Sequence, residues 1–445
     1  MSSETKSVKL YRVLILVVFI VALSLRIYWI EQKQGLHVDE IATHYVGTTD
    51  LYSWRDLHDT YHPKKIETFW HTLQNETDVH KNLKILAGLR KDNHGDITHT
   101  NLHYSIYRIW TAFSQKDSFT LKEFIWNGCL LNLIFFSISF IFMYKLLRLV
   151  FKDEKYIPLS LAAAFLNTGG ISNTLFIRCY ALQETMFVIF AYYFVKLWYC
   201  VSKKTTAKFT IALCLTMMTG YFAQIYTGIL SIALFIRHAY DAVINNAVKN
   251  FKSTVKAIFD RVQFLLYATI FASILCVILY EHYFGYFDTI YTNDIIDNLN
   301  NISISHFWMT KIRVTSLYVH YIIYVVLLPF IIIAAAANSK AKADRVLLIL
   351  ILLTILWGYA VMHITPHFDA RFILAACPII ALLGPYMLSK LSEKVFNPVQ
   401  IIYVLILFLY AIFPIPQEAS GHPNCVEIPN NIFRSNIEYT FMITK

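Results

Sequence analysis

Long apolar runs separated by short polar connections make up most of the chain. The longer runs reach the length that an α-helix needs to cross a hydrocarbon core of about 30 Å. The pattern predicts an all-α polytopic membrane protein with about eleven transmembrane helices. The expected spans cover residues 13–30, 124–147, 157–171, 176–200, 209–220, 221–236, 264–280, 317–336, 346–361, 372–388 and 401–413.

Composition agrees with a membrane protein, because 57% of the residues are hydrophobic, 15% are charged and the mean hydropathy is +0.49. A net charge of +10 would indicate a nucleic-acid partner in a soluble protein. Here the Lys and Arg residues lie in short loops between apolar runs, where they orient a chain in the bilayer. We therefore expect a lipid bilayer as partner and no nucleic acid. The 7 cysteines form no C-x-x-C pair, so they predict neither a zinc site nor a disulfide framework.

The loop charges predict one orientation for the whole chain. With the N-terminus in the cytoplasm, the basic N-terminal tail and the later clusters of Lys and Arg fall inside, while outer connections such as those at Arg178 and Arg371 hold few. Because Arg26 interrupts the first run and no small-residue cleavage site follows it, we expect an anchor rather than a signal peptide. The expected location is the plasma membrane of a bacterium. The expected parts are a tail and first span (1–30), a first outer loop (31–122), a transmembrane bundle (123–415) and an outer C-terminal tail (416–445).

The outer loop at residues 31–122 is the one large polar segment. Apolar residues recur in it at helical spacing from Val79 to Leu89, which predicts an amphipathic helix on the membrane surface. Near its start, a few residues after the first span, lies the acidic pair Asp39–Glu40. This position places two carboxylates at the membrane surface.

Four short motifs carry a family resemblance, and they occur at residues 37–43, 99–110, 178–182 and 369–372. Their order and the topology around them resemble the GT-C class of membrane glycosyltransferases. More narrowly, they resemble the bacterial family-39-like enzymes, which include protein O-mannosyltransferases, the aminoarabinose transferase of lipid A and lipopolysaccharide galacturonosyltransferases. The resemblance implies an inverting transfer of a sugar from a polyprenyl-phosphate donor to a glycolipid, polysaccharide or protein acceptor on the outer face.

The resemblance points to Asp39 as the catalytic base, with Glu40 in support. A carboxylate at the mouth of the bundle can accept the proton of an acceptor hydroxyl if partial burial or a neighbouring like charge raises its pKa. The structural alternative is that two exposed acids simply follow the end of a helix.

Arg178 and Arg371 are the expected cations for the departing phosphate. A guanidinium binds phosphate oxygens bidentately and does not lose its proton. Each arginine lies at the outer edge of a span, so simple snorkelling to the interface is the alternative. The residues that we expect to contact substrate are His37, His99, His103, Tyr104, Tyr180, His367 and Asp369.

One motif departs from the family pattern, since Thr100, Asn101 and His103 stand where relatives commonly have two prolines and a tyrosine. We expect no required cofactor. A divalent metal is left open, because several histidines and Asp39 could converge at the outer face and suit zinc. Hydrogen-bonded or solvated histidine is the commoner state.

Two other functions fit parts of the sequence. A flippase or transporter of lipid-linked sugars would place charges along span interiors and pair broken helices across two halves. The short runs on either side of Gly220 keep that alternative open. A catalytically inactive relative that serves as an assembly subunit is the other alternative, which the residues at positions 100 and 101 permit.

Overall fold

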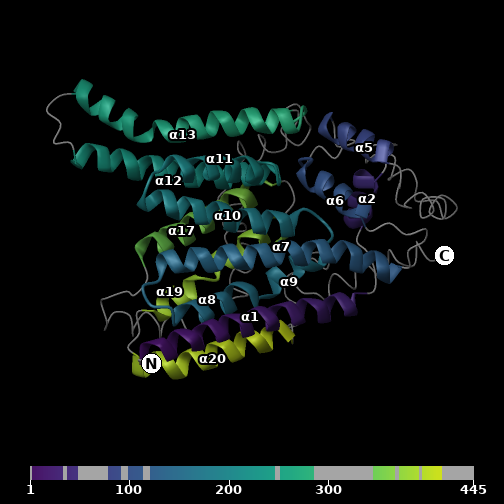
Figure 1. Ribbon diagram of the computed structural model, residues 1–445, viewed down its shortest axis with the longest axis horizontal. Helices are drawn as coiled ribbons and strands as arrows, with labels where there is room; N and C mark the ends of the chain where they lie inside the picture. Colours follow the sequence, from purple (N-terminus) through teal and green to yellow (C-terminus); the bar gives the residue numbers. More distant parts are fainter. Residues whose placement is uncertain are drawn as a thin grey trace.

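The computed structural model describes residues 3–33, 38–48, 79–91, 99–113, 121–245, 251–284, 344–365, 370–389 and 393–412. Within these ranges the protein contains helices and no strands, as the apolar pattern predicts. The long helices run roughly parallel or antiparallel to one another in a single bundle (Figure 1). They are α1 (Ser3–Gln32), α7 (Leu121–Val150), α10 (Tyr180–Tyr199), α12 (Tyr221–Asn245), α13 (Phe251–Leu279), α17 (Arg345–Ile364) and α20 (Glu393–Ile412).

Five of the described helices are long and apolar enough to cross a membrane: those at Lys9–Gln32, Lys122–Val150, Tyr221–Ile244, Lys252–Leu279 and Arg345–Ile364. Shorter apolar helices occur at Tyr156–Phe165, Leu374–Leu388 and Gln400–Leu409. Together they confirm a polytopic all-α architecture. The count of eleven spans stays a prediction, and the expected span at residues 317–336 lies outside the described residues.

Helix α10 lies in the interior of the bundle and packs against α7, α11 (Lys203–Met217) and α12. Most of its side chains are buried, including the polar pair Gln183 and Glu184. The Glu184 carboxylate accepts a hydrogen bond of 2.8 Å from the Asn173 amide, which satisfies a buried polar group. The apolar α10 is therefore a core helix.

Two predicted spans are interrupted. Residues 157–171 form α8 (Tyr156–Phe165) and α9 (Thr168–Leu175), because Asn167 ends the first helix and its side chain caps the second through the Gly170 amide. Residues 372–388 form short pieces, and prolines at positions 378 and 385 explain breaks there. The pieces are η2 (Ala370–Phe372), η3 (Leu374–Ala376), α18 (Cys377–Ile380) and α19 (Leu383–Leu388).

Gly220 separates α11 from α12, which contact each other as two distinct helices. The sequence left open whether the two short runs on either side of this glycine were one broken segment. A backbone turn at Gly220, with φ of 158°, resolves them into two helices. The two helices contribute separate faces to the bundle.

Helices α2 (Val38–Thr48), α5 (Val79–Lys91) and α6 (Leu102–Phe113) gather at one end of the bundle (Figure 1). The expected amphipathic helix is α5, whose Ile85 and Leu89 are buried against Val46 and Tyr104 while Val79 stays exposed. Its partners are therefore α2 and α6 on one face.

Candidate functional site

The acidic pair occupies the first turn of α2, where the partial positive charge of a helix N-terminus stabilises carboxylates. Successive residues on an α-helix point about 100° apart, since a turn holds about 3.6 residues. Asp39 and Glu40 consequently reach different partners. The two carboxylates do not form one site.

Glu40 is fully buried and forms an ion pair with Lys33, which lies just beyond the end of α1. The same carboxylate accepts a hydrogen bond of 2.8 Å from the backbone N–H of Ile177. The Lys33 ammonium also donates to the Leu175 carbonyl at 2.7 Å. This group joins the end of α1, the start of α2 and the segment after α9.

Asp39 forms an ion pair with Arg371 of η2, and both side chains keep partial exposure, 15% and 22% respectively. The pair links the start of α2 to a segment 332 residues away in the sequence. Because both groups remain accessible at the end of the bundle, a ligand can reach them. The predicted base and one predicted cation are therefore in direct contact.

Arg178 contacts the turn of α2 that carries Asp39. Its guanidinium donates to the backbone carbonyl of Asp39 at 3.2 Å and to the Thr43 hydroxyl at 3.0 Å. It also donates to the Tyr104 hydroxyl at 3.2 Å and lies 3.2 Å from Nδ1 of His99. A side chain that is 3% exposed and held from several sides is not snorkelling to an interface. Arg178 ties α2 and α6 to the start of α10.

His103 of α6 is buried at 2% exposure, and its ring packs against those of Tyr104 and Tyr107. Neither ring nitrogen has a hydrogen-bond partner in the described part of the chain. Burial, followed by the positive charge of Arg178, lowers the pKa of His103 to about 3. The imidazole is therefore neutral, and its burial favours packing over the substrate contact that we expected.

Thr100 and Asn101, which depart from the expected family pattern, link α5 and α6 to the bundle. The Thr100 hydroxyl donates to the Met218 carbonyl at the end of α11. The Asn101 amide donates to the carbonyls of Leu89 at 3.0 Å and Leu279 at 2.9 Å. These bonds hold the ends of α5 and α13 beside the start of α6, and so position His99 and Tyr104.

Tyr180 starts α10 and stacks on Phe176, with Phe372 packed against both. It therefore lies beside η2, which carries Arg371. The remaining predicted contacts, His37, His367 and Asp369, lie outside the described residues. Within the described ranges no group of three or more His, Cys, Asp or Glu side chains is placed to hold a metal ion.

Sequence reasoning missed Lys33 and Thr43. The signal for Lys33 was present, since a basic residue at the membrane surface precedes an acid by seven positions in a loop too short to separate them widely. Thr43 lies one helical turn after Asp39, so its hydroxyl shares that face of α2. Both residues position the acids.

The described residues form an all-helical bundle with a carboxylate, two guanidiniums and a tyrosine gathered at one end. A family model described as "Alg9-like mannosyltransferase family" matches residues 96–423, well over half of the chain. The chain belongs to this family, which makes it a GT-C membrane glycosyltransferase. The matched range includes Arg178 and Arg371, whereas Asp39 and Glu40 precede it. The narrower likeness to family-39 enzymes stays a prediction.

Among solved structures, the chain is similar to ArnT from Cupriavidus metallidurans. The form bound to undecaprenyl phosphate is 12% identical, with a TM-score of 0.49, over 99% of this chain and 71% of that chain. The apo form is also 12% identical, with a TM-score of 0.47, over 99% of this chain and 76% of that chain. No curated protein sequence matches the chain significantly.

Proposed function

We propose that the protein transfers a sugar from a polyprenyl-phosphate donor to an acceptor hydroxyl, at the end of the bundle formed by α2 and α6. The observation that carries this proposal is the accessible Asp39–Arg371 pair with Arg178 bonded to the same segment of α2. It supplies both a carboxylate for the acceptor and cations for a phosphate. Membership of a mannosyltransferase family supports mannose as the first sugar to test.

The proposed reaction is a single inverting displacement. The Asp39 carboxylate accepts the proton of the acceptor hydroxyl, whose oxygen forms the new bond to the anomeric carbon. The bond from that carbon to the phosphate oxygen breaks, and the polyprenyl phosphate leaves with the bonding electrons. Developing negative charge on the phosphate is stabilised by guanidinium groups.

Arg371 gives this scheme an order of events. Without donor it forms an ion pair with Asp39. The phosphodiester of an incoming donor carries one negative charge, as a carboxylate does, and its two free oxygens can compete for the same guanidinium. Donor binding would then free Asp39 to meet the acceptor. The base becomes available only when there is a donor to attack.

We propose that Glu40 and Lys33 act by positioning α2. We also propose that the reaction needs no divalent metal, because two guanidiniums supply the positive charge that a metal would otherwise provide. Full activity after dialysis against EDTA is the expected result. Loss of activity that returns with one divalent ion would contradict this part of the proposal.

We further propose that the site faces the outer side of the plasma membrane, with the N-terminus in the cytoplasm. The distribution of basic loop residues supports this orientation. The acceptor is the hydroxyl of a glycolipid, polysaccharide or protein that reaches the membrane surface.

The decisive experiment compares Asp39→Asn with wild type in membranes supplied with polyprenyl-phosphate mannose and an extract of envelope acceptors. Asp39→Asn keeps the side-chain size but removes the base, so transfer of radiolabelled sugar should fall by about 10²-fold or more. Glu31→Gln is the matched control, because Glu31 is an exposed acid at the same end that pairs with Lys122. Transfer by Asp39→Asn at the level of the control would eliminate Asp39 as the base.

A further inference from the structure

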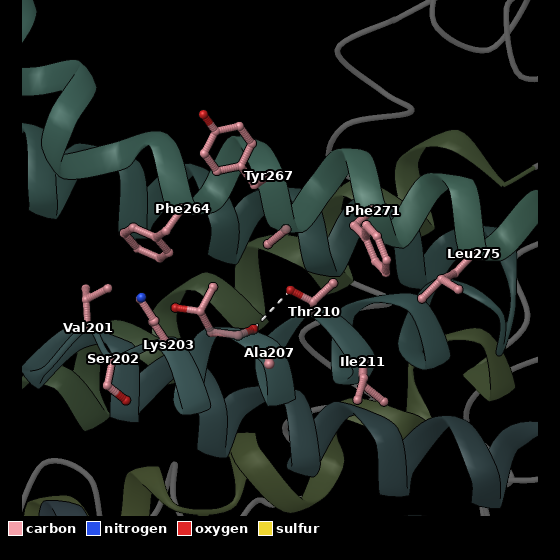
Figure 2. A pocket seen from close by; sticks show the side chains of 12 residues that line it. Val201, Ser202, Lys203, Ala207, Thr210, Ile211, Phe264, Tyr267, Phe271 and Leu275 are labelled. Atoms are coloured by element: carbon pink, nitrogen blue, oxygen red, sulfur yellow. Dashed lines mark hydrogen bonds between the residues drawn. The ribbon is translucent and has the colours of Figure 1, made fainter.

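An open apolar groove runs between α11 and α13, on a face of the bundle that the proposed site does not use (Figure 2). Its volume is about 640 Å³, and its walls are mainly apolar side chains. They include Ile211, Tyr267 and Phe271, which are 55%, 60% and 61% exposed. On a membrane protein, side chains of this kind face lipid. The groove is therefore open to the bilayer along its length.

Small residues of α11 form the floor of the groove. Ala207 and Thr210 lie there, and the Thr210 hydroxyl donates to the Thr206 carbonyl at 3.0 Å (Figure 2). This bond satisfies the Thr210 hydroxyl within its own helix, so the threonine presents little unpaired polarity to the groove. The floor suits a hydrocarbon chain.

The length of the groove matches one leaflet of a bilayer. Its α13 wall extends from Phe264 to Leu275, which is about 16 Å at 1.5 Å per residue. Half of a hydrocarbon core of about 30 Å is about 15 Å. One acyl chain of a single leaflet therefore fits along the wall.

The groove has a basic end. Lys203 lines it, and in Figure 2 its ammonium points toward Phe264 and Val201. Lys203 and its exposed neighbour Lys204 form no ion pair within the described part of the chain, and α11 contains no acidic residue. On the facing helix, Asp260 is the one acid of α13, whose basic residues are Lys252, Lys256 and Arg261. Positive charge therefore exceeds negative charge where the groove reaches the membrane surface.

We propose that this groove binds an anionic phospholipid, with one acyl chain between α11 and α13 and its phosphate at Lys203 and Lys204. The apolar walls alone would accept any lipid, so the charge of the lysines makes the site selective for an anionic headgroup. The loop charges predict that this end faces the cytoplasm, where anionic lipids concentrate. The site is separate from the Asp39–Arg371 pair, which lies at the opposite end of the bundle (Figure 1).

The test uses the purified full-length chain in detergent, titrated with phosphatidylglycerol or phosphatidylcholine, and native mass spectrometry to count bound lipid. Wild type should retain phosphatidylglycerol in preference to phosphatidylcholine. Lys203→Glu combined with Lys204→Glu should weaken phosphatidylglycerol binding about tenfold or more and leave phosphatidylcholine binding unchanged. Lys152→Glu, an exposed lysine on the connection after α7, is the control and should behave as wild type.

A second pair of variants tests the hydrocarbon part of the site. Ala207→Trp fills the groove from its floor and should reduce phosphatidylglycerol binding to the level of the double lysine variant. Ile232→Trp, on an exposed face of α12 outside the groove, should have no effect. If the lysine variant loses helix content by circular dichroism, the comparison of these two tryptophan variants decides the question.

Three results would overturn the proposal. Equal binding of both phospholipids by wild type would remove selectivity, and equal effects of Ala207→Trp and Ile232→Trp would remove the groove. Displacement of phosphatidylglycerol by an equal concentration of polyprenyl phosphate would assign the groove to that lipid instead. Asp39→Asn should bind phosphatidylglycerol as wild type does, so failure of the proposed reaction would leave this inference intact.

Discussion

Asp39 and Glu40 are neighbours in the sequence, but their side chains differ in exposure to solvent. This difference separates a side chain that stabilises the fold from one that a ligand can reach. The Glu40–Lys33 pair is completely buried and is held further by the backbone of Ile177 and Leu175. The Asp39–Arg371 pair is at the surface of the same end of the bundle and is partly exposed. A sealed pair fixes a conformation, whereas an accessible pair can exchange one partner for a ligand.

The difference arises from the helix that carries both acids. Rotation of about 100° per residue turns Glu40 toward the bundle and Asp39 toward the end of it. Desolvation of a buried ion pair is repaid only when its hydrogen-bonding capacity is satisfied, as it is for Glu40 and Lys33. Removing one member of the buried pair should therefore destabilise the fold. Removing one member of the accessible pair should lower activity and change stability little.

The largest effect is expected from Asp39→Asn. Loss of the proposed base should lower the turnover of sugar transfer by about 10²- to 10⁴-fold while the thermal stability stays close to that of wild type. Radiolabelled transfer and a melting curve on the same preparation measure the two properties. A large fall in stability would instead place Asp39 with Glu40 as a structural residue.

Lys33→Met should affect folding most. It leaves the Glu40 carboxylate buried without its cation, which destabilises the protein by about 3–5 kcal/mol. Combining it with Glu40→Leu removes both charges and should recover much of that loss. Thermal unfolding in detergent measures the change, and a double variant no more stable than Lys33→Met would show that the pair is not the cause.

Arg371→Ala should weaken the use of the lipid-linked donor by about 10- to 100-fold, because it removes one of the two proposed charge-assisted contacts to the phosphate. The effect should appear in the concentration of donor needed for half-maximal rate. Arg371→Lys should recover part of it, since the ammonium keeps the charge but lacks the planar fork. An unchanged donor requirement in Arg371→Ala would eliminate Arg371 as a donor-binding residue.

His103 is a buried ionisable side chain outside both acid pairs, and the pH dependence of stability tests the effect of its burial. Its pKa is about 3 in the folded protein and near 6.5 when unfolded, so the unfolded state binds more protons between those values. Stability should therefore fall as the pH falls from about 6.5 toward 3, and His103→Phe should lessen the fall. Between pH 7 and 8 the two proteins should respond alike. An equal acid response in the variant would assign the sensitivity to other groups.

Tyr104→Phe should have the smallest effect. It removes one hydrogen bond of 3.2 Å to Arg178, and the bonds of that guanidinium to Thr43 and Asp39 remain. Transfer should fall by about three- to tenfold. Phe is the closest apolar match for the ring, so a loss as large as that of Asp39→Asn would indicate that the hydroxyl contacts substrate directly.

The apolar pattern predicted the class of fold and the end of the bundle at which the acids lie. It could do so because a span of known length places whatever follows it at the membrane surface. The interruptions at Asn167 and near Pro378 had local signals, namely the sequence Asn-Thr-Gly-Gly at 167–170 and a Cys-Pro step at 377–378. A prediction from hydrophobicity alone does not resolve such short breaks.

The pairing of the site residues was not predictable from the sequence. Arg178 and Arg371 were candidates because each follows an outer connection, but which acid each would contact depends on the rotation of α2 and on the packing of distant helices. Lys33 neutralises the charge of the Glu40 carboxylate and so changes the role expected for Glu40. Burial of His103 likewise depends on how α6 packs.

The Asp39–Arg371 contact joins parts of the chain that are made far apart in time. At about 5–20 residues per second, a ribosome needs roughly 17–66 s to advance the 332 residues from one partner to the other. Through that interval the emerging chain holds the carboxylate without the arginine that pairs with it. If both are required, a half-made protein does not consume the cell's lipid-linked sugars, and translation itself delays activity until the late helices are in place.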